Sequence, residues 1–462
     1  MSQTSTIPGA RNLMGIQNIR QIQKTSLLGF AMDCWQTYDD LFFMQLGPGG
    51  LHFAAHPEMV RAISLSSDYS KVGSYAGVRQ FLMGDGLITS VDKSWRRQRK
   101  TLSPFFTPRG ITQYAEMMLD ECNRLLESWG NFADTGEYLD IGDEMLGFAA
   151  RIILQAIFSI EQTERIQQIS KDVDTALAFV STRHQSLIHL PLWWPNARIH
   201  RYNQAYARLQ GFVNQLIVQR RDMPMDEWPR DILTTLLQTP LVADEEENEQ
   251  VISNALIFDN CMTFFVAGHE TTARNLAFTL YQLSQNPEAE AKLIAEVDDV
   301  LNGGPVTIDA LKQMPYSLQV IKESLRLYPI AAYYPRDVIV DTTLQTSAGQ
   351  TYTLSVGDTV MLFPYATHRH PDFWHAPDQF DPDRFTPDAE SNRHPYAYAP
   401  FAAGQRVCIG NNFSLLESQL FLASMYQRFR VRLRPEHDPR IQAVATIQPT
   451  AGLPMRIERL KR

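Results

Sequence analysis

One short run, at residues 401–410, constrains this chain of 462 residues more than any other. It reads Phe-Ala-Ala-Gly-Gln-Arg-Val-Cys-Ile-Gly and places Cys408 in a turn between two glycines, ahead of an apolar segment with helical spacing. Backbone N–H groups and the positive end of a helix dipole stabilise a thiolate at such a position. Taken alone, a cysteine there is most often a small buried hydrophobic residue. Other motifs must therefore decide what Cys408 does.

A second motif lies inside a long helix expected over about residues 249–284. Residues 267–272 read Ala-Gly-His-Glu-Thr-Thr. Glycine inside a helix costs about 0.8–1 kcal/mol relative to alanine, so we expect a bent helix whose opened hydrogen-bond ladder forms a groove. The carboxyl group of Glu270 next to the hydroxyl group of Thr271 is the combination that proton delivery requires. His269 is expected to face solvent or to be hydrogen-bonded, and not to bind a metal.

Two weaker motifs involve charged side chains. Glu323 and Arg326 lie three residues apart on one face of an expected helix. An exposed pair of this kind contributes only about 0–1 kcal/mol. Trp95 and Arg99 lie four residues apart, and an indole N–H with a guanidinium is a suitable donor pair for a carboxylate.

Together these motifs resemble the cytochrome P450 family. The first run matches the family's Phe-x-x-Gly-x-Arg-x-Cys-x-Gly signature at all five specified positions. The other motifs match Ala-Gly-x-[Asp/Glu]-Thr, Trp-x-x-x-Arg and Glu-x-x-Arg, and Pro-Asp-Arg-Phe follows the last of these at residues 382–385. The resemblance implies a mainly α protein with the cytochrome P450 fold, as one domain over residues 1–462. A small β-rich lobe is expected mainly from about residues 40–65, 330–365 and 430–462, with a large helical body from the rest.

The resemblance also implies roles for individual residues. Cys408 is expected to bind the iron of heme b as an axial thiolate, and Thr271 and Glu270 to be catalytic by supplying protons. Further haem contacts are expected from Trp95, Arg99, Ala267, Arg336, Phe401, Arg406 and Gly410. Glu323, Arg326 and Arg384 are expected to be structural and to hold the segment that carries the cysteine. The substrate pocket is expected to include Leu87, Ala267, Ala331, Ala332 and Leu453, with an entrance loop at residues 190–195.

The function implied is that of a monooxygenase that uses dioxygen to hydroxylate or epoxidise a hydrophobic fatty acid, terpenoid or steroid-like molecule. Electrons are expected from a separate ferredoxin or flavodoxin-type donor with its reductase. Arg96, Arg97 and Lys100 are expected to be surface charges, with a basic docking face for ferredoxin as the alternative. A peroxygenase and a haem-binding protein without turnover remain alternatives of the same fold. His52 stands where fatty-acid hydroxylases of the family hold a substrate carboxylate, and we expect it to be a surface histidine.

Composition agrees with a soluble enzyme. The chain is 44% hydrophobic and 20% charged, with a formal net charge of −9 that argues against nucleic acid as a partner. Its four cysteines show no paired spacing, so no disulfide and a reducing compartment are expected. Residues 1–24 are polar and basic with no long apolar core, so we expect a cytoplasmic protein with no membrane anchor. A monomer is expected by default. The acidic run at residues 244–249 is expected to be a solvated loop.

Patterns of apolar residues and of glycine and proline predict the remaining elements. A β-hairpin is expected over residues 42–46 and 51–54, with a helix starting after His56. Further helices are expected over 111–160 with a break near 130–137, and over 163–187, 197–221, 308–327 and 411–429. Strands are expected over 338–343, 351–354, 359–363 and 455–459.

Overall fold

The computed structural model describes residues 6–185, 190–241, 251–346, 349–443 and 445–460. The chain divides into two compact units. The first contains Met1–Ser70, Met118–Met145 and Thr271–Arg462, and the second contains Lys71–Met117 and Leu146–Glu270. In the part of the chain that the structure describes, no helix is both long and apolar enough to cross a membrane.

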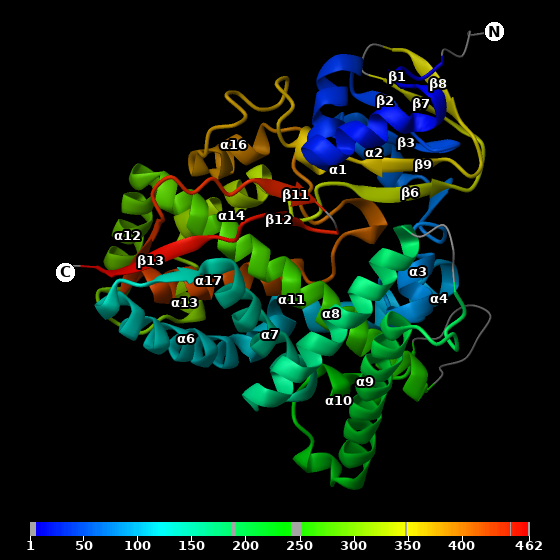
Figure 1. The fold of residues 1–462 in the computed structure, drawn as a ribbon. Helices are drawn as coiled ribbons and strands as arrows, with labels where there is room; N and C mark the ends of the chain where they lie inside the picture. The colour runs from blue at the N-terminus through cyan, green and yellow to red at the C-terminus, as the bar shows by residue number, and fades with distance from the viewer. Residues whose placement is uncertain (1–5, 186–189, 242–250, 347–348, 444, 461–462) are drawn as a thin grey trace. The chain divides into compact units, whose positions relative to one another are not determined.

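A six-stranded sheet is the main β structure of the first unit (Figure 1), with its strands in the order β1-β2-β3-β9-β6-β4. The predicted hairpin is confirmed as β2 (Leu41–Leu46) and β3 (Gly49–Ala54), which pair antiparallel. Across it, the rings of Phe42 and Phe53 stack with centroids 5.0 Å apart. The other strands are β1 (Gly9–Ala10), β4 (Tyr69–Ser70), β6 (Tyr334–Val338) and β9 (Thr359–Leu362).

The helix predicted after His56 is confirmed as α2 (Pro57–Leu65), with the His56 ring accepting a hydrogen bond from the Glu58 N–H at the helix start. Its apolar face packs into the core cluster beside the sheet, where Met59, Val60 and Val360 are buried. The strand predicted over residues 338–343 was wrong. β6 ends at Val338, and the exposed residues 339–341 that follow form no strand. A separate strand, β7 (Thr342–Gln345), then pairs with β8 (Thr351–Leu354).

A second sheet joins distant parts of the chain in the order β10-β13-β5. β10 (Phe429–Leu433) and β13 (Pro454–Arg459) pair antiparallel, and β5 (Tyr138–Asp140) pairs with β13. β5 occupies the predicted break between helices α6 (Ala115–Thr135) and α7 (Ile141–Phe158), which lies later than expected. A small hairpin of β11 (Ile441–Ala443) and β12 (Ile447–Pro449) completes this region.

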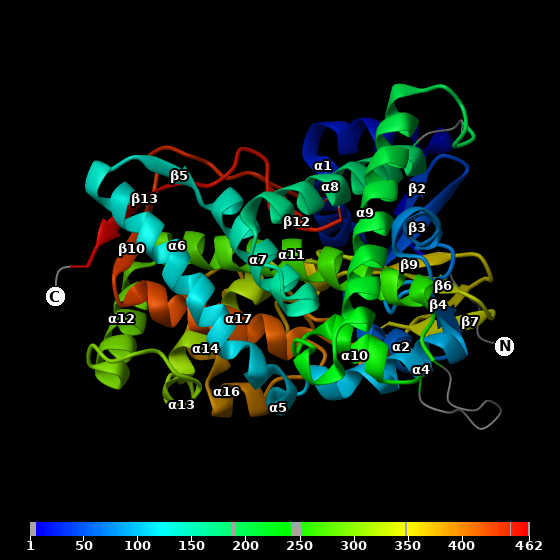
Figure 2. The same cartoon turned by 90° about the horizontal axis from the view of Figure 1, so that it is seen from below.

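The first unit also contains helices, and α6 crosses α17 (Asn411–Tyr426) in Figure 2. At that crossing Trp129 lies edge-on to Phe421, with ring centroids 6.0 Å apart, and the Trp129 indole N–H donates to Glu144 Oε2 at 3.0 Å.

Helix α1 (Ile16–Tyr38) was not predicted, because its polar sequence carries little periodic signal. The helix predicted over residues 308–327 is two helices, because Pro315 begins a new one. The remaining helices are α12 (Pro287–Leu301), α13 (Ile308–Leu311), α14 (Pro315–Leu327), α15 (Pro364–Thr367) and α16 (Pro387–Ser391).

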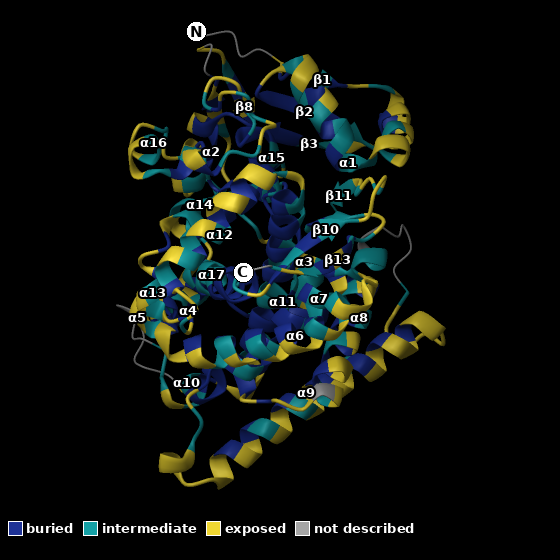
Figure 3. Ribbon diagram, turned by 90° about the vertical axis from the view of Figure 1, so that its left-hand side faces the viewer, coloured by how far each residue is buried: buried dark blue, intermediate teal, exposed yellow. Residues whose placement is uncertain are grey.

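The second unit is helical. α8 (Thr163–Gln185) packs on α9 (Ala197–Asp222), with the rings of Phe179 and Tyr202 stacked 4.2 Å apart. One side of α9 is exposed along its length (Figure 3). Residues 186–189 and the acidic run 244–249 lie outside the described residues. The remaining helices are α3 (Ala76–Val78), α4 (Asp92–Leu102), α5 (Pro108–Ile111) and α10 (Ile232–Gln238), while α11 (Asn254–Gln285) continues from this unit into the first.

Candidate active site

The turn that carries Cys408 is built by backbone hydrogen bonds. Its N–H donates to the carbonyl of Phe401 at 2.9 Å, after a single 3-10 turn at Gly404–Arg406. Gly404 has φ of +67°, and a Cβ there would lie 2.3 Å from the carbonyl oxygen of Ser64. Only glycine therefore fits this position without displacing the backbone of α2 and its C-cap.

Cys408 is exposed, whereas Cys34, Cys122 and Cys261 are buried. Gly410 is the N-cap of α17, so the Cys408 sulfur lies just ahead of the first turn of a 16-residue helix. The helix dipole favours the anionic form of a thiol at this end. An accessible sulfur with this electrostatic support is a suitable ligand for iron, and the residues present fit the cofactor that the sequence predicts.

Glu323 and Arg326 form a bidentate pair in the interior of the first unit. Arg326 Nε donates to Glu323 Oε2 at 2.6 Å and Nη2 to Oε1 at 2.8 Å, and both side chains are 0% exposed. Arg384 lies in the short 3-10 turn Pro382–Phe385, and its Nε is 3.5 Å from Glu323 Oε1. The structure thus brings these three residues together. Sequence spacing alone did not show that the pair is fully buried.

Arg326 also binds the backbone of the following loop. Its guanidinium donates to the carbonyl oxygens of His368, Pro377 and Gln379 at 2.9, 2.5 and 2.9 Å. Glu323 Oε1 accepts from the N–H of Asp381 at 2.8 Å. The buried pair therefore fixes a long stretch of backbone that has no regular secondary structure of its own.

His368 links this network to the cysteine turn, and the sequence reasoning missed it. Its Nδ1–H donates to the carbonyl of Arg326 at 3.2 Å, and its Nε2 accepts from the N–H of Ala399 at 2.9 Å. Acceptance at Nε2 requires the neutral imidazole with its proton on Nδ1. Burial, and next the charge of Arg326, lower the pKa of His368 to about 3. An isolated histidine carries no pattern in the sequence that would have identified this role.

Helix α11 is tied to α17 by polar side chains within the first unit. Thr272 Oγ1 lies 3.2 Å from Ser414 Oγ, and Asn275 Nδ2 donates to Ser418 Oγ at 3.1 Å. Thr271 precedes the first of these contacts and is half-buried. The helix that carries Thr271 is therefore held against the helix that begins after Cys408. These four contact residues were not predicted, because their partners are distant in sequence.

Other predicted residues of the first unit lie on separate elements. Arg336 is on β6, buried, with its guanidinium 5.0 Å from the Tyr334 ring centroid. Arg406 is half-buried in the cysteine turn. Of the predicted pocket residues, Ala332 and Leu453 are buried and Ala331 is half-buried.

In the second unit, Trp95 and Arg99 lie one turn apart on α4, so they share a face of that helix. Trp95 is buried and Arg99 is half-buried. The expectation that Arg97 is a surface charge, or part of a basic docking face, was wrong. Arg97 is 8% exposed, because it lies on the inner side of α4, whereas Arg96 and Lys100 are exposed.

The remaining predicted residues of the second unit are on or beside α11. A Cβ on Gly268 would lie 2.9 Å from Ile153 Cδ1, so this glycine allows α7 to approach closely. Ala267 and Glu270 are half-buried. Partial desolvation, followed by the charge of Glu270, raises the pKa of Asp174, although its side chain is exposed. Asp174 is therefore a second carboxyl group near Glu270 that sequence reasoning did not identify.

Leu87 is held to α11 by an amide network. Its N–H donates to Asn260 Oδ1 at 3.1 Å, and Asn260 Nδ2 donates to Gln98 Oε1 at 2.9 Å. Both amide residues are buried. The loop that carries Leu87 is thereby anchored to α4 and α11 inside the second unit.

Burial contradicts the expectation for His52 and leaves one of the two expected positions for His269. His52 was predicted to lie on the surface, but it is 8% exposed because β3 is an inner strand of the sheet, and its ring lies 4.9 Å from that of Phe43. Burial lowers the pKa of His52. His269 is also buried and stacks on Phe265 at 5.2 Å, so it does not face solvent.

Comparison with known proteins agrees with this arrangement. The Cytochrome P450 family model matches residues 7–453. The chain is 31% identical over 427 residues to cyclooctat-9-en-7-ol 5-monooxygenase of Streptomyces melanosporofaciens, covering 88% of each protein. It is 30% identical over 456 residues to pentalenene oxygenase of Streptomyces avermitilis, covering 98% of this chain and 96% of that one. The crystal structure of the cytochrome P450DA heme domain aligns with a TM-score of 0.84 at 26% identity, covering 99% of this chain and 98% of the other.

The chain belongs to the cytochrome P450 family. The predicted family, the P450 fold and the assignment to the P450 monooxygenases are thereby confirmed. Membership of this family implies a haem whose iron is bound by a cysteine thiolate. It also implies a hydrophobic substrate, dioxygen and redox partners.

The buried His368 predicts a defined pH dependence of stability. A histidine with a folded pKa near 3 and an unfolded pKa near 6.5 binds more protons when unfolded, so stability is complete above about pH 6.5 and falls as the pH is lowered toward 3. Between pH 7 and pH 4 this residue should remove about 3 kcal/mol from the free energy of unfolding. The measurement is urea unfolding at several pH values for the wild type and H368Q.

The H368Q variant should lose less stability over this interval, because glutamine does not titrate. H200Q, which removes an exposed histidine, is the matched control and should follow the wild type. Parallel curves for H368Q and the wild type would contradict the assignment.

Proposed function

We propose that the chain is a haem-thiolate monooxygenase that oxidises an uncharged terpenoid, with Cys408 as the iron ligand. The observation that carries this proposal is the exposed Cys408 at the start of α17, in a turn fixed by the buried network around Arg326. When bound, the haem supplies the activation of dioxygen and the transfer of one oxygen atom to the substrate.

The chain's own residues would bind this group at its edges and faces. Cys408 Sγ would bind the iron, and Trp95, Arg99, Arg336 and Arg406 would supply donors for the carboxylates of the group. Ala267, Phe401 and Gly410 are residues of the pocket wall. Small side chains at Ala267 and Gly410 leave room for a planar ring, and Phe401 supplies an apolar surface.

Proton supply is assigned to adjacent residues of α11. Thr271 Oγ1 holds the proton that the oxygen chemistry consumes, and the carboxyl group of Glu270 replaces it from solvent. The exposed carboxyl group of Asp174, whose pKa is raised by partial desolvation and by the charge of Glu270, is a further proton reservoir beside Glu270. A peroxygenase needs no such relay, because peroxide already carries its protons.

Two observations favour a terpenoid over a fatty acid. The pocket residues Leu87, Ala331, Ala332 and Leu453 are apolar, so they bind by burial of apolar area, about 25 cal/mol per Å². His52, the one candidate carboxylate partner on the first hairpin, is buried with a lowered pKa and is therefore neutral. The relatives named above act on cyclooctat-9-en-7-ol and pentalenene by their names, which supports the same class.

The first prediction concerns Thr271. With a ferredoxin, its reductase and NADPH supplied, T271A should form at least about 10-fold less product per NADPH, because proton supply of this kind contributes 10²–10⁴-fold. Hydrogen peroxide should rise in compensation. T271S keeps the hydroxyl group and is the control that should stay near the wild type.

Equal coupling in T271A and the wild type would contradict the proton relay. Product formed from hydrogen peroxide alone, at the rate seen with the redox partners, would favour the peroxygenase. Spectral changes on ligand binding with no product in either assay would favour a haem-binding protein without turnover.

The second prediction concerns the substrate class. Loss of the iron-bound water on substrate entry shifts the haem spin state, so binding can be titrated by absorbance. Cyclic terpene alcohols and hydrocarbons should shift it at concentrations at least about 10-fold lower than fatty acids of equal carbon number, since a buried carboxylate without a partner costs at least 1.4 kcal/mol. Tighter binding of the fatty acids would contradict the assignment.

A further inference from the structure

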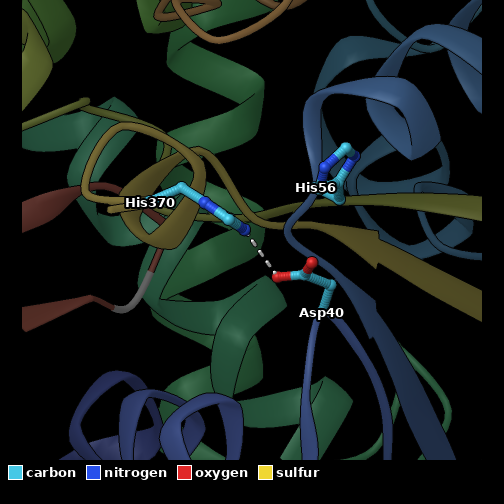
Figure 4. Close-up of side chains that lie close together, drawn as sticks. All are labelled: Asp40, His56 and His370. Atoms are coloured by element: carbon cyan, nitrogen blue, oxygen red, sulfur yellow. Dashed lines mark hydrogen bonds and ion pairs between the residues drawn. The ribbon is translucent and has the colours of Figure 1, made fainter. Parts of the chain in front are cut away.

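Three side chains of types that bind metals lie close together in the first unit, and none of them belongs to the cysteine turn (Figure 4). Asp40, His56 and His370 are all buried, and one ligand atom from each lies within 4.8 Å of the other two. They come from different segments. Asp40 directly precedes β2, His56 follows β3 and caps α2, and His370 lies in the loop after α15.

The separations suit a small metal ion. His370 Nε2 and Asp40 Oδ1 are 3.0 Å apart. Two ligands of a tetrahedral zinc ion, each about 2.0 Å from the metal, are about 3.3 Å apart, so this edge already has nearly the required length. The rings of His56 and His370 are 5.3 Å apart and nearly perpendicular at 87°, which lets both present a nitrogen to one point.

Neighbouring groups orient these side chains. The indole N–H of Trp35 donates to Asp40 Oδ1 at 3.1 Å, and the backbone carbonyl of Asp40 accepts from the Ala55 N–H at 2.9 Å. His56 Nδ1 accepts from the Glu58 N–H, while its Nε2 has no hydrogen bond within the described residues. Outer contacts of this kind hold the ligands of metal sites in place.

The ring of His370 can also adopt the tautomer that binding requires. Its proton must move from Nε2 to Nδ1, and Nδ1 lies 4.0 Å from the carboxylate oxygen Oδ2 of the exposed Asp372. Nδ1 now accepts a hydrogen bond from the backbone N–H of Asp372 at 3.3 Å, and this hydrogen bond must then break. A carboxylate behind a ligating histidine is a common feature of zinc sites.

We propose that Asp40, His56 and His370 form a binding site for a divalent transition-metal ion, with zinc as the best-fitting member of that class. Two imidazoles and one carboxylate are a frequent zinc ligand set, and a water completes the tetrahedron. Calcium and magnesium prefer oxygen ligands and fit less well. The ion would cross-link the start of the first hairpin, the start of α2 and the loop after α15, so its role is structural.

The test uses the full holoprotein without a histidine tag, treated with a chelator and then dialysed against micromolar zinc. Metal content by mass spectrometry should show one zinc per chain beyond the haem iron, and calorimetry should give the affinity. H56N should weaken zinc binding at least about 100-fold, since loss of a supporting contact alone costs 10–100-fold. Asparagine is a strong N-cap, so this variant keeps the start of α2 intact.

H394Q is the matched control, because His394 contacts Glu58 Oε1 at 2.7 Å beside the cluster but is not part of it. It should bind zinc like the wild type. H370Q replaces H56N if circular dichroism shows that H56N is misfolded. A wild-type chain without bound zinc, or unchanged affinity in both ligand variants, would overturn the proposal and leave a hydrogen-bonded histidine–aspartate pair.

Zinc content is measured separately from iron and from turnover. Failure of this proposal therefore has no bearing on the monooxygenase assignment, and the wild-type measurement decides the matter even if every variant misfolds.

Discussion

In the interior of the first unit, the guanidinium of Arg326 donates two hydrogen bonds to Glu323 and one each to the carbonyls of His368, Pro377 and Gln379. A charge at 0% exposure is tolerated only when its donors are matched, and removal of one partner of such a pair costs about 3–5 kcal/mol. These bonds reach across a loop that has little regular structure of its own. The same loop leads to the cysteine turn, so the position of the thiol depends on this buried pair.

Two separate sets of polar contacts hold the chain on either side of Cys408. His368 connects the Arg326 carbonyl to the N–H of Ala399, two residues before the turn begins. On the other side, Thr272 and the neighbouring turn of α11 contact serines of α17. The Cys408 sulfur is held in one place because buried polar contacts fix both the loop before it and the helix after it.

The sequence predicted what depends on local pattern and missed what depends on distant partners. The first hairpin and α9 follow from turn residues and periodicity, and both are confirmed. The burial of His52 and Arg97 was mispredicted, since it depends on the neighbours that a strand or helix face meets. His368 and Asn260 were not identified at all, because a single polar residue carries no periodic signal and its partners lie far away in the chain. The strand β5 was missed for the same reason, because it exists only through pairing with the C-terminal strand.

The proposed function requires a bond between Cys408 and the haem iron. The decisive measurement is the absorption spectrum of the reduced, carbon monoxide-bound protein. The wild type should show the strongly red-shifted Soret band of thiolate ligation, and Cys408→Ala should lose that band while retaining its helical circular dichroism. A Soret band typical of imidazole ligation in the wild type, or an unchanged red-shifted band in the variant, would contradict the claim.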